Sequence, residues 1–150
     1  MLDHASDAEL RRPTDGTRWN NKQLLFHMLL GYLIVRALSG LVVTFDRLPT
    51  SEDRHFAHIL NAVTVPFDSI NYAGSWLAGT VLSRRALGAL FERVIASLHR
   101  PKPRTTSHGP CASRPGGWDP FFRETMTLAE VYHFPTQHFD FHRAQLTLTR

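Results

Sequence analysis

The 150-residue sequence is poor in cysteine and contains few long hydrophobic runs. Its single cysteine, Cys111, cannot form a disulfide within the chain, so nothing indicates an oxidising compartment. The first residues include Asp3, Asp7 and Glu9 and lack the apolar run of a signal peptide. We therefore expect a cytoplasmic protein.

Only one hydrophobic run, Leu24–Phe45, has the length needed to cross a bilayer. Arg36 falls near its midpoint, where inserting a charged side chain costs about 2.5 to 3.5 kcal/mol. His27 adds another polar group to the run. These residues favour a helix that is buried on most sides in a soluble bundle, and no membrane span is expected.

The sequence also lacks any stretch that alternates between apolar and polar residues as an amphipathic strand does. Several stretches instead repeat apolar residues with a helical period. The chain length suits one domain with its own core. The sequence thus predicts a single all-α domain over residues 1–150, a helical bundle with a short lead-in at 1–19.

Capping signals and prolines give the expected bounds of the helices. Ser6 to Glu9 has capping-box spacing, and Pro13 limits the helix that follows to about two turns. Asn20 or Asn21 is expected to cap a long helix that ends near Phe45. Further helices are expected from Ser51 to Pro66, from Phe67 to about Leu77, from Ser83 to Leu98, and from a turn at Thr127 into a final helix that opens at Pro135.

Residues 100–120 form a Pro-rich loop, because they hold five of the nine prolines and show no apolar periodicity. The loop has no aromatic interleaving and no known nucleic-acid-binding motif, so a solvated loop is favoured over a nucleic-acid interface. No group near Cys111 would activate its thiol, and this residue is assigned no role. The basic residues that a nucleic acid would contact are Arg100, Lys102, Arg104 and Arg114.

Two histidines near the end of the chain, His138 and His142, have a spacing of four residues. On a helix this spacing puts both imidazoles on one face with Cβ atoms about 5 to 6 Å apart, close enough to bind one metal ion. Phe134 and Phe141 continue the same stripe, so we expect both histidines to face the core. The pair alone also fits ordinary histidines that are hydrogen-bonded to polar neighbours.

His27 is the candidate third ligand. It lies within the long apolar helix, where a neutral imidazole needs a polar partner or a metal ion. Three histidines leave one coordination position free for water or substrate, an arrangement that suits Zn²⁺ first and also Ni²⁺ or Fe²⁺. The predicted metal ligands are therefore His27, His138 and His142.

Two segments of the chain resemble the signature segments of the DinB-like superfamily of bacterial four-helix-bundle proteins. The first runs from Trp19 to His27, and the second is His138-Phe-Asp-Phe-His142-Arg-Ala-Gln145, where the family commonly has His-Arg-Gly-Gln at the end. The resemblance covers roughly residues 10–148. It implies a bundle in which one histidine and the His-x-x-x-His pair of the last helix hold a divalent metal.

The family includes bacillithiol- and mycothiol-dependent S-transferases and a mycothiol-dependent maleylpyruvate isomerase. For this chain the resemblance implies a metal site and the transfer of a low-molecular-weight thiol to a small electrophile. The motif residues offer no acid/base partner, so no catalytic residue is assigned. Family members usually begin with a full helix, and only residues 2–12 stand in its place here. Either the true start of the protein lies upstream of residue 1, or other helices or a homodimer partner cover the exposed face.

Other interpretations of the sequence stay open. The bundle could bind metal without catalysis, or the metal could activate water for hydrolysis. Glu52 to His55 and Glu130 to His133 have the Glu-x-x-His spacing of di-iron bundles, with Glu92 as a further ligand. The long helix contains no carboxylate to complete such a site. Glu52 and Glu130 are better explained as favourable charges at helix N-termini.

Overall fold

The computed structural model of the chain describes residues 2, 4–45, 69–99, 111–112, 125–126 and 128–149. This part is mostly helical, so the predicted all-α class is confirmed for the described residues. The helix expected from Ser51 and most of the loop 100–120 lie outside them. The helices are α1 (Asp7–Arg11), α2 (Asn21–Phe45), a helix over residues 69–81, α4 (Arg84–Leu98) and α5 (Leu128–Arg143).

One short antiparallel pair joins β1 (Cys111–Ala112) to β2 (Thr125–Met126). No strand is expected from the sequence; β1 lies within the expected loop 100–120, and β2 lies after it. A ladder of two residues is held by backbone hydrogen bonds and needs no alternation of side chains. So short a ladder therefore has no recognisable pattern of side chains in the sequence.

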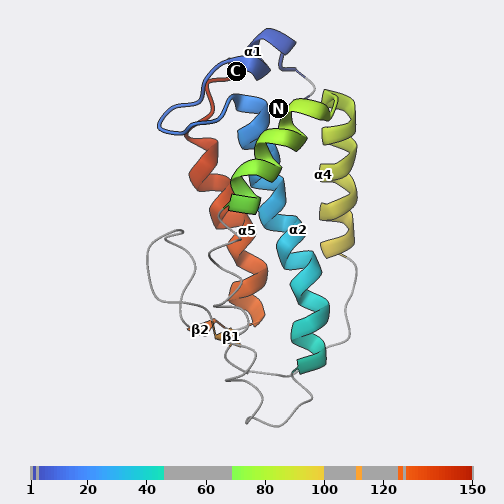
Figure 1. Cartoon of the computed structure of the whole chain (residues 1–150). Coiled ribbons are helices and arrows are strands. Elements are labelled where there is room, and N and C mark those ends of the chain that lie inside the picture. Colours follow the sequence, from blue (N-terminus) through green and yellow to red (C-terminus); the bar gives the residue numbers. More distant parts are fainter. Residues whose placement is uncertain are drawn as a thin grey trace.

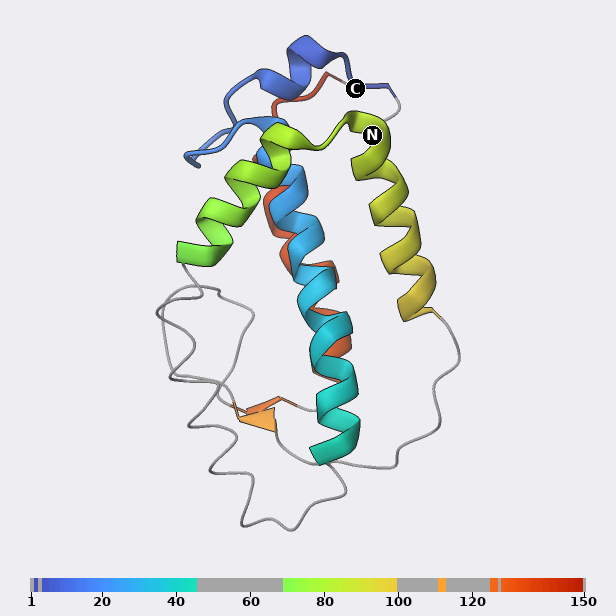
Figure 2. The same ribbon diagram turned by 45° about the vertical axis from the view of Figure 1, so that its right-hand side comes forward.

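α2 is the central helix of the fold. It packs along α5, which runs antiparallel to it, and it also contacts α4 and α1 (Figure 1). The helix over residues 69–81 runs toward α1, and α4 runs back in the opposite direction. These two helices form an inverted V beside α2 (Figure 2). The buried apolar core comes mainly from α2 and α4: Leu24, Leu25, Phe26, Met28, Leu29, Leu87 and Val94.

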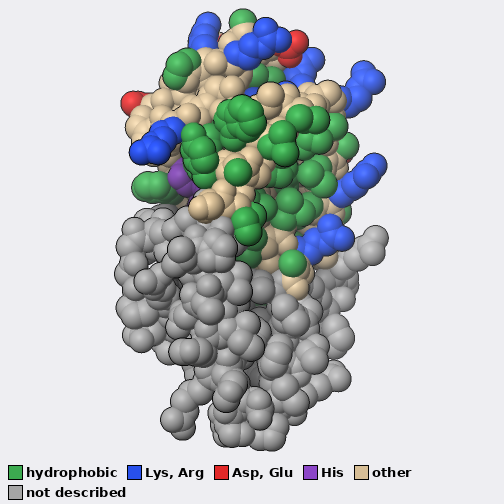
Figure 3. Space-filling model, in the orientation of Figure 1, with side chains coloured by type: hydrophobic (Ala, Val, Ile, Leu, Met, Phe, Trp, Pro, Cys, Tyr) green, Lys and Arg blue, Asp and Glu red, His purple; other side chains and the backbone are tan. Residues whose placement is uncertain are grey.

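The long apolar run of the sequence lies in α2. Among the described residues, no helix has both the length and the apolarity that a membrane crossing requires. One face of residues 69–81 and α4 is nevertheless rich in exposed apolar side chains (Figure 3). The large exposed apolar side chains of these two helices are Ile70, Tyr72, Trp76, Leu77, Val81 and Ile95.

Predicted capping residues set the starts of three helices. The Ser6 side chain accepts from the Glu9 N–H and the Glu9 carboxylate accepts from the Ser6 N–H, which completes a capping box at α1. Asn20 and Gln23 make the same reciprocal pair at α2. Ser83 caps α4. Local signals therefore place these helix ends correctly.

The start of α5 differs from the prediction. The helix begins at Leu128, and Pro135 lies inside it instead of at its first position. A proline within a helix removes one backbone hydrogen bond and crowds the preceding turn, at a cost of about 3 kcal/mol. Phe134 and Pro135 are both buried, and we infer that this packing offsets the lost bond. The turn expected from Thr127 is thus continuous with the histidine helix.

Asn21 ties together the start of α2, α1 and the segment after α5. Its side chain is fully buried and donates to the Glu9 carbonyl and to Thr147 Oγ1, at 2.8 and 2.9 Å. Its Oδ1 accepts from the Thr147 N–H. The Glu9 carboxylate accepts from the Thr149 N–H. The segment that follows His142 is therefore held against α1 and the start of α2.

Hydrogen bonds from Ser6 and then Thr149 lower the pKa of Glu9. Because the folded-state pKa is lowered, Glu9 stabilises the fold at pH values above its unfolded-state pKa of about 4.3. This stabilisation is lost as the pH falls through the folded-state pKa. We expect Glu9→Gln to lower the melting temperature at pH 7, with the difference from wild type shrinking by about pH 3. Thermal unfolding followed by circular dichroism measures this. Equal differences at both pH values would contradict it, and Glu92→Gln, on the exposed side of α4, is the control.

Residues 69–81 approach α2 at Gly79. A Cβ at this position would lie 2.5 Å from Gln23 Cα and 3.0 Å from its backbone nitrogen, which cannot move aside as a side chain can. We expect Gly79→Ala to force the two helices apart and to destabilise the fold by about 1 to 3 kcal/mol in urea unfolding. Gly74→Ala is the matched control, because nothing lies within 4 Å of a Cβ there. Equal stabilities of the two variants would contradict the close approach.

Candidate metal centre

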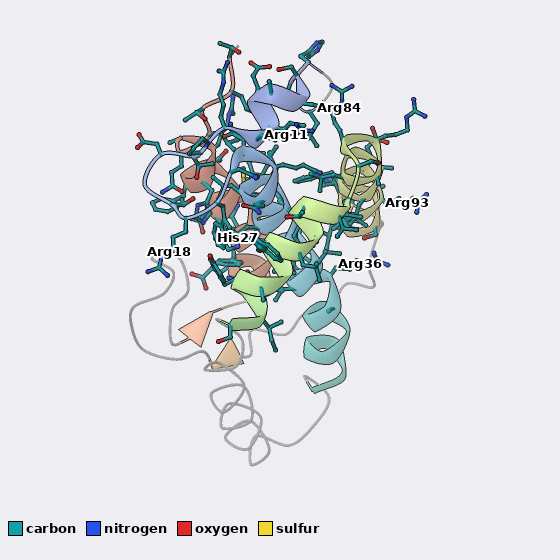
Figure 4. The ribbon with its side chains drawn as sticks, turned by 45° about the horizontal axis from the view of Figure 1, so that its top comes forward. Arg11, Arg18, His27, Arg36, Arg84 and Arg93 are labelled. Atoms are coloured by element: carbon teal, nitrogen blue, oxygen red, sulfur yellow. The ribbon has the colours of Figure 1, made fainter. Side chains whose placement is uncertain are left out.

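Three histidines from two antiparallel helices meet in the bundle. His27 comes from α2, and His138 and His142 come from successive turns of α5. Their ligand nitrogens all lie within 4.8 Å of one another, and they form the one such group of histidine, cysteine or acidic side chains among the described residues. His27 lies inside the bundle, whereas Arg18 and Arg93 lie at its periphery (Figure 4). The structure thus brings together all three predicted ligands in a group that could hold a metal ion.

Two of the histidines have Nδ1 next to the oxygen of a side-chain amide. His27 Nδ1 lies 3.0 Å from Asn71 Oδ1, and His142 Nδ1 lies 2.6 Å from Gln145 Oε1. The roles of the ring nitrogens depend on the tautomer. Because an amide oxygen only accepts a hydrogen bond, both contacts are satisfied by the tautomer that carries its proton on Nδ1. In a neutral ring the other nitrogen, Nε2, is then unprotonated.

The Nε2 atoms of His27 and His142 are 3.2 Å apart. Two lone pairs at this separation repel unless a metal ion or an additional proton lies between them. A tetrahedral Zn²⁺ with Zn–N bonds of 2.0 to 2.1 Å would hold two ligand nitrogens about 3.3 Å apart. The separation of this pair therefore fits a shared metal ion. The three ligand atoms together lie within 4.8 Å of one another, which is wider than a tetrahedral ion would hold them, so the group would have to close around the ion.

His138 fits closely between the two helices because residue 31 is glycine. A Cβ at Gly31 would lie 3.3 Å from His138 Cδ2, which is tighter than an ordinary contact. Phe134 packs against the same imidazole, with ring centroids 5.5 Å apart. Gly31 lies one helical turn after His27, so it makes room for His138 on the face of α2 that carries the first ligand.

The site opens on the side of His142. His27 and His138 are 7 % and 6 % exposed, whereas His142 is only partly buried. Trp19 packs on His27, with ring centroids 4.5 Å apart. The Trp19 Nε1 atom is buried and has no hydrogen-bond partner among the described residues.

Phe141 does not face the core as predicted. It is 46 % exposed and packs edge-on against His142, with ring centroids 5.1 Å apart. It lies one residue before His142, which turns it about 100° around the helix. The prediction that Phe141 belongs to the buried stripe was therefore wrong, and Phe141 instead lies at the border of the site.

The ligands and their hydrogen-bond partners carry no negative charge. The group contains three imidazoles and no carboxylate or thiolate. The atoms that orient His27 and His142 are amide oxygens. A divalent ion bound here would keep its full charge, and this favours an anion or an easily deprotonated ligand at the free position.

The rival interpretations gain no support from the described residues. His133 is exposed on α5, and no metal-capable group of the described residues includes it, Glu130 or Glu92. Glu52 and His55 lie outside the description. The basic loop residues Arg100, Lys102, Arg104 and Arg114 also lie outside it.

Sequence reasoning missed Asn71 and the role of Gly31. Asn71 is 44 residues from His27 and belongs to another helix, so no local spacing connects them. From the sequence, Gly31 was only a glycine within the predicted long helix, and nothing indicated its contact with His138. Gln145 was identified by position and by the motif, but not as the partner of His142.

Comparison with models of protein families, with curated proteins and with solved structures found no match. The site is therefore supported by its geometry. The resemblance to the DinB-like superfamily stays a prediction.

Asn71 should control metal affinity through His27. We expect Asn71→Leu to weaken Zn²⁺ binding by about 10- to 100-fold, because His27 Nδ1–H loses its acceptor and the ring its orientation. Asn71→Asp should keep the affinity, since a carboxylate accepts the same hydrogen bond. Competition with a chromogenic chelator measures both, and thermal unfolding of the metal-free proteins controls for folding. If Asn71→Leu binds Zn²⁺ as tightly as wild type, Asn71 does not orient His27.

Proposed function

We propose that this chain is a DinB-like protein that binds one divalent metal ion through His27, His138 and His142. Zn²⁺ is the proposed ion, with Ni²⁺ or Fe²⁺ as alternatives. The observation that supports this most is the 3.2 Å separation of two Nε2 atoms whose Nδ1 partners are both amide oxygens. The order of the two sequence motifs agrees with it.

The proposed activity is the transfer of a low-molecular-weight thiol to a small electrophile. A divalent ion at this site would supply positive charge that lowers the pKa of a thiol or water at the free position. The thiol would lose its proton to solvent, its sulfur would form a bond to the electrophilic carbon, and the leaving group would depart with the bonding electrons. The uncharged ligand set and the partial burial of the site support this chemistry.

Within this proposal each residue has a defined task. His27, His138 and His142 hold the ion, while Asn71 and Gln145 fix the ring nitrogens that face it. Trp19 packs on His27 and shields it from water. The proposed compartment is the cytoplasm.

Two further functions fit the same site. In a hydrolase, water would take the place of the thiol. In a non-catalytic bundle, the ion would only bridge α2 and α5 and stabilise their packing. Both share the metal centre, so a test of the metal comes before a test of activity.

Metal content of the purified chain without an affinity tag tests the metal centre. We expect about one divalent ion per chain by mass spectrometry and its loss in a His138→Ala/His142→Ala variant, because one remaining ligand cannot hold the ion. His133→Ala is the matched control, since this histidine is exposed on the same helix. Wild type that takes up no Zn²⁺, Ni²⁺ or Fe²⁺ would contradict the proposal.

Consumption of thiol with a model electrophile then separates the functions. Activity that needs the metal and is lost in His142→Ala supports thiol transfer. Ester hydrolysis without thiol consumption supports the hydrolase. A bound metal with neither activity, but with a higher melting temperature, supports the non-catalytic bundle.

A further inference from the structure

Two exposed aromatic side chains are linked to the metal centre by ring contacts, and the proposed metal ligation does not use them. Phe141, from α5, is 46 % exposed and packs against His142. Tyr72, from residues 69–81, is 44 % exposed and stacks on Trp19, with ring centroids 5.9 Å apart and planes 25° apart. Trp19 in turn covers His27. We call Trp19, Tyr72 and Phe141 the aromatic rim.

The aromatic rim contacts two of the three histidines: Trp19 packs on His27, and Phe141 packs on His142. His27 and His138 are buried, so the approach is from the side of His142, and Phe141 packs on that residue. Tyr72 directly follows Asn71, whose side chain holds His27, so the same helix turn carries both a rim residue and an orienting residue. Figure 3 shows a histidine side chain at the surface beside hydrophobic side chains.

The aromatic rim offers a bound molecule different chemistry from that of the three histidines. Its exposed rings offer flat apolar surface, and burying such surface against a planar ligand is favourable. The uncharged histidine group offers a position for an anionic head.

We propose that the site selects ligands with two parts: an anionic oxygen or sulfur head at the free metal position and a planar, aromatic body held against Tyr72 and Phe141. This inference rests on the proposed metal centre and names the class of substrate it takes. Tyr72 and Phe141 are then specificity-determining residues. They act on the body of the ligand and leave the binding of its head unchanged.

Two hydroxamates with the same head test the inference. Benzohydroxamate carries a phenyl ring and acetohydroxamate a methyl group, and both bind a divalent ion through the same two oxygens. Dissociation constants are measured with the Co²⁺-loaded full chain by the change in visible absorption, and each is divided by the value for free Co²⁺. We expect the phenyl compound to bind about tenfold more tightly after this correction, because its ring buries apolar surface on the rim.

The Tyr72→Ala/Phe141→Ala variant should reduce this preference to less than about threefold and leave acetohydroxamate binding within about twofold of wild type. Leu77→Ala is the matched control. It removes an exposed apolar side chain of the same helix, 56 % exposed, about 140° around from Tyr72. It should keep the full preference. Circular dichroism and Co²⁺ content verify that each variant is folded and loaded.

The other possible results would contradict either the inference or the proposed function. Equal corrected affinities for the two hydroxamates, or a preference that survives in Tyr72→Ala/Phe141→Ala, would overturn the inference. A chain that holds Co²⁺ but binds neither hydroxamate would overturn it too and leave the metal centre intact. A chain that holds no Co²⁺ would contradict the proposed function itself, and the inference would fall with it.

Discussion

The candidate metal centre depends on the close approach of two imidazole nitrogens, whose lone pairs repel each other when both Nε2 atoms are unprotonated. His27 and His142 direct their Nε2 atoms at each other across 3.2 Å. Asn71 and Gln145 hold the opposite nitrogens, so neither ring can turn without breaking a hydrogen bond. Positive charge between the rings removes the conflict. The contact of Gly79 with α2 brings the Asn71 helix into range, and thus backbone packing and site chemistry are coupled.

Much of the fold could be predicted because its signals are local. A capping residue and its partner lie three positions apart, so Ser6, Asn20 and Ser83 marked helix starts that the structure has. The spacing of His138 and His142 is local in the same way, and the apolar run around His27 indicated a buried imidazole. Predicting that His27 lies beside His138 and His142 required either the family resemblance or the assumption of a helical bundle.

The failures arise where packing between helices overrides a local preference. Pro135 was expected to open a helix, but burial beside Phe134 keeps the helix continuous through it. Phe141 was assigned to the core by spacing, although one residue of rotation puts it at the border of the site. Asn71 could not have been found, because its partner lies on a different helix and an asparagine in a helix has no distinctive pattern.

The most direct test of the account is long-range ¹H–¹⁵N NMR of the imidazole rings, with and without Zn²⁺ at neutral pH. The account predicts that His27 and His142 both carry their proton on Nδ1, and that their Nε2 resonances shift when Zn²⁺ is added. Protonated Nε2 atoms that do not change with excess Zn²⁺ would contradict it. In that case a proton, and not a metal ion, would occupy the space between the two rings.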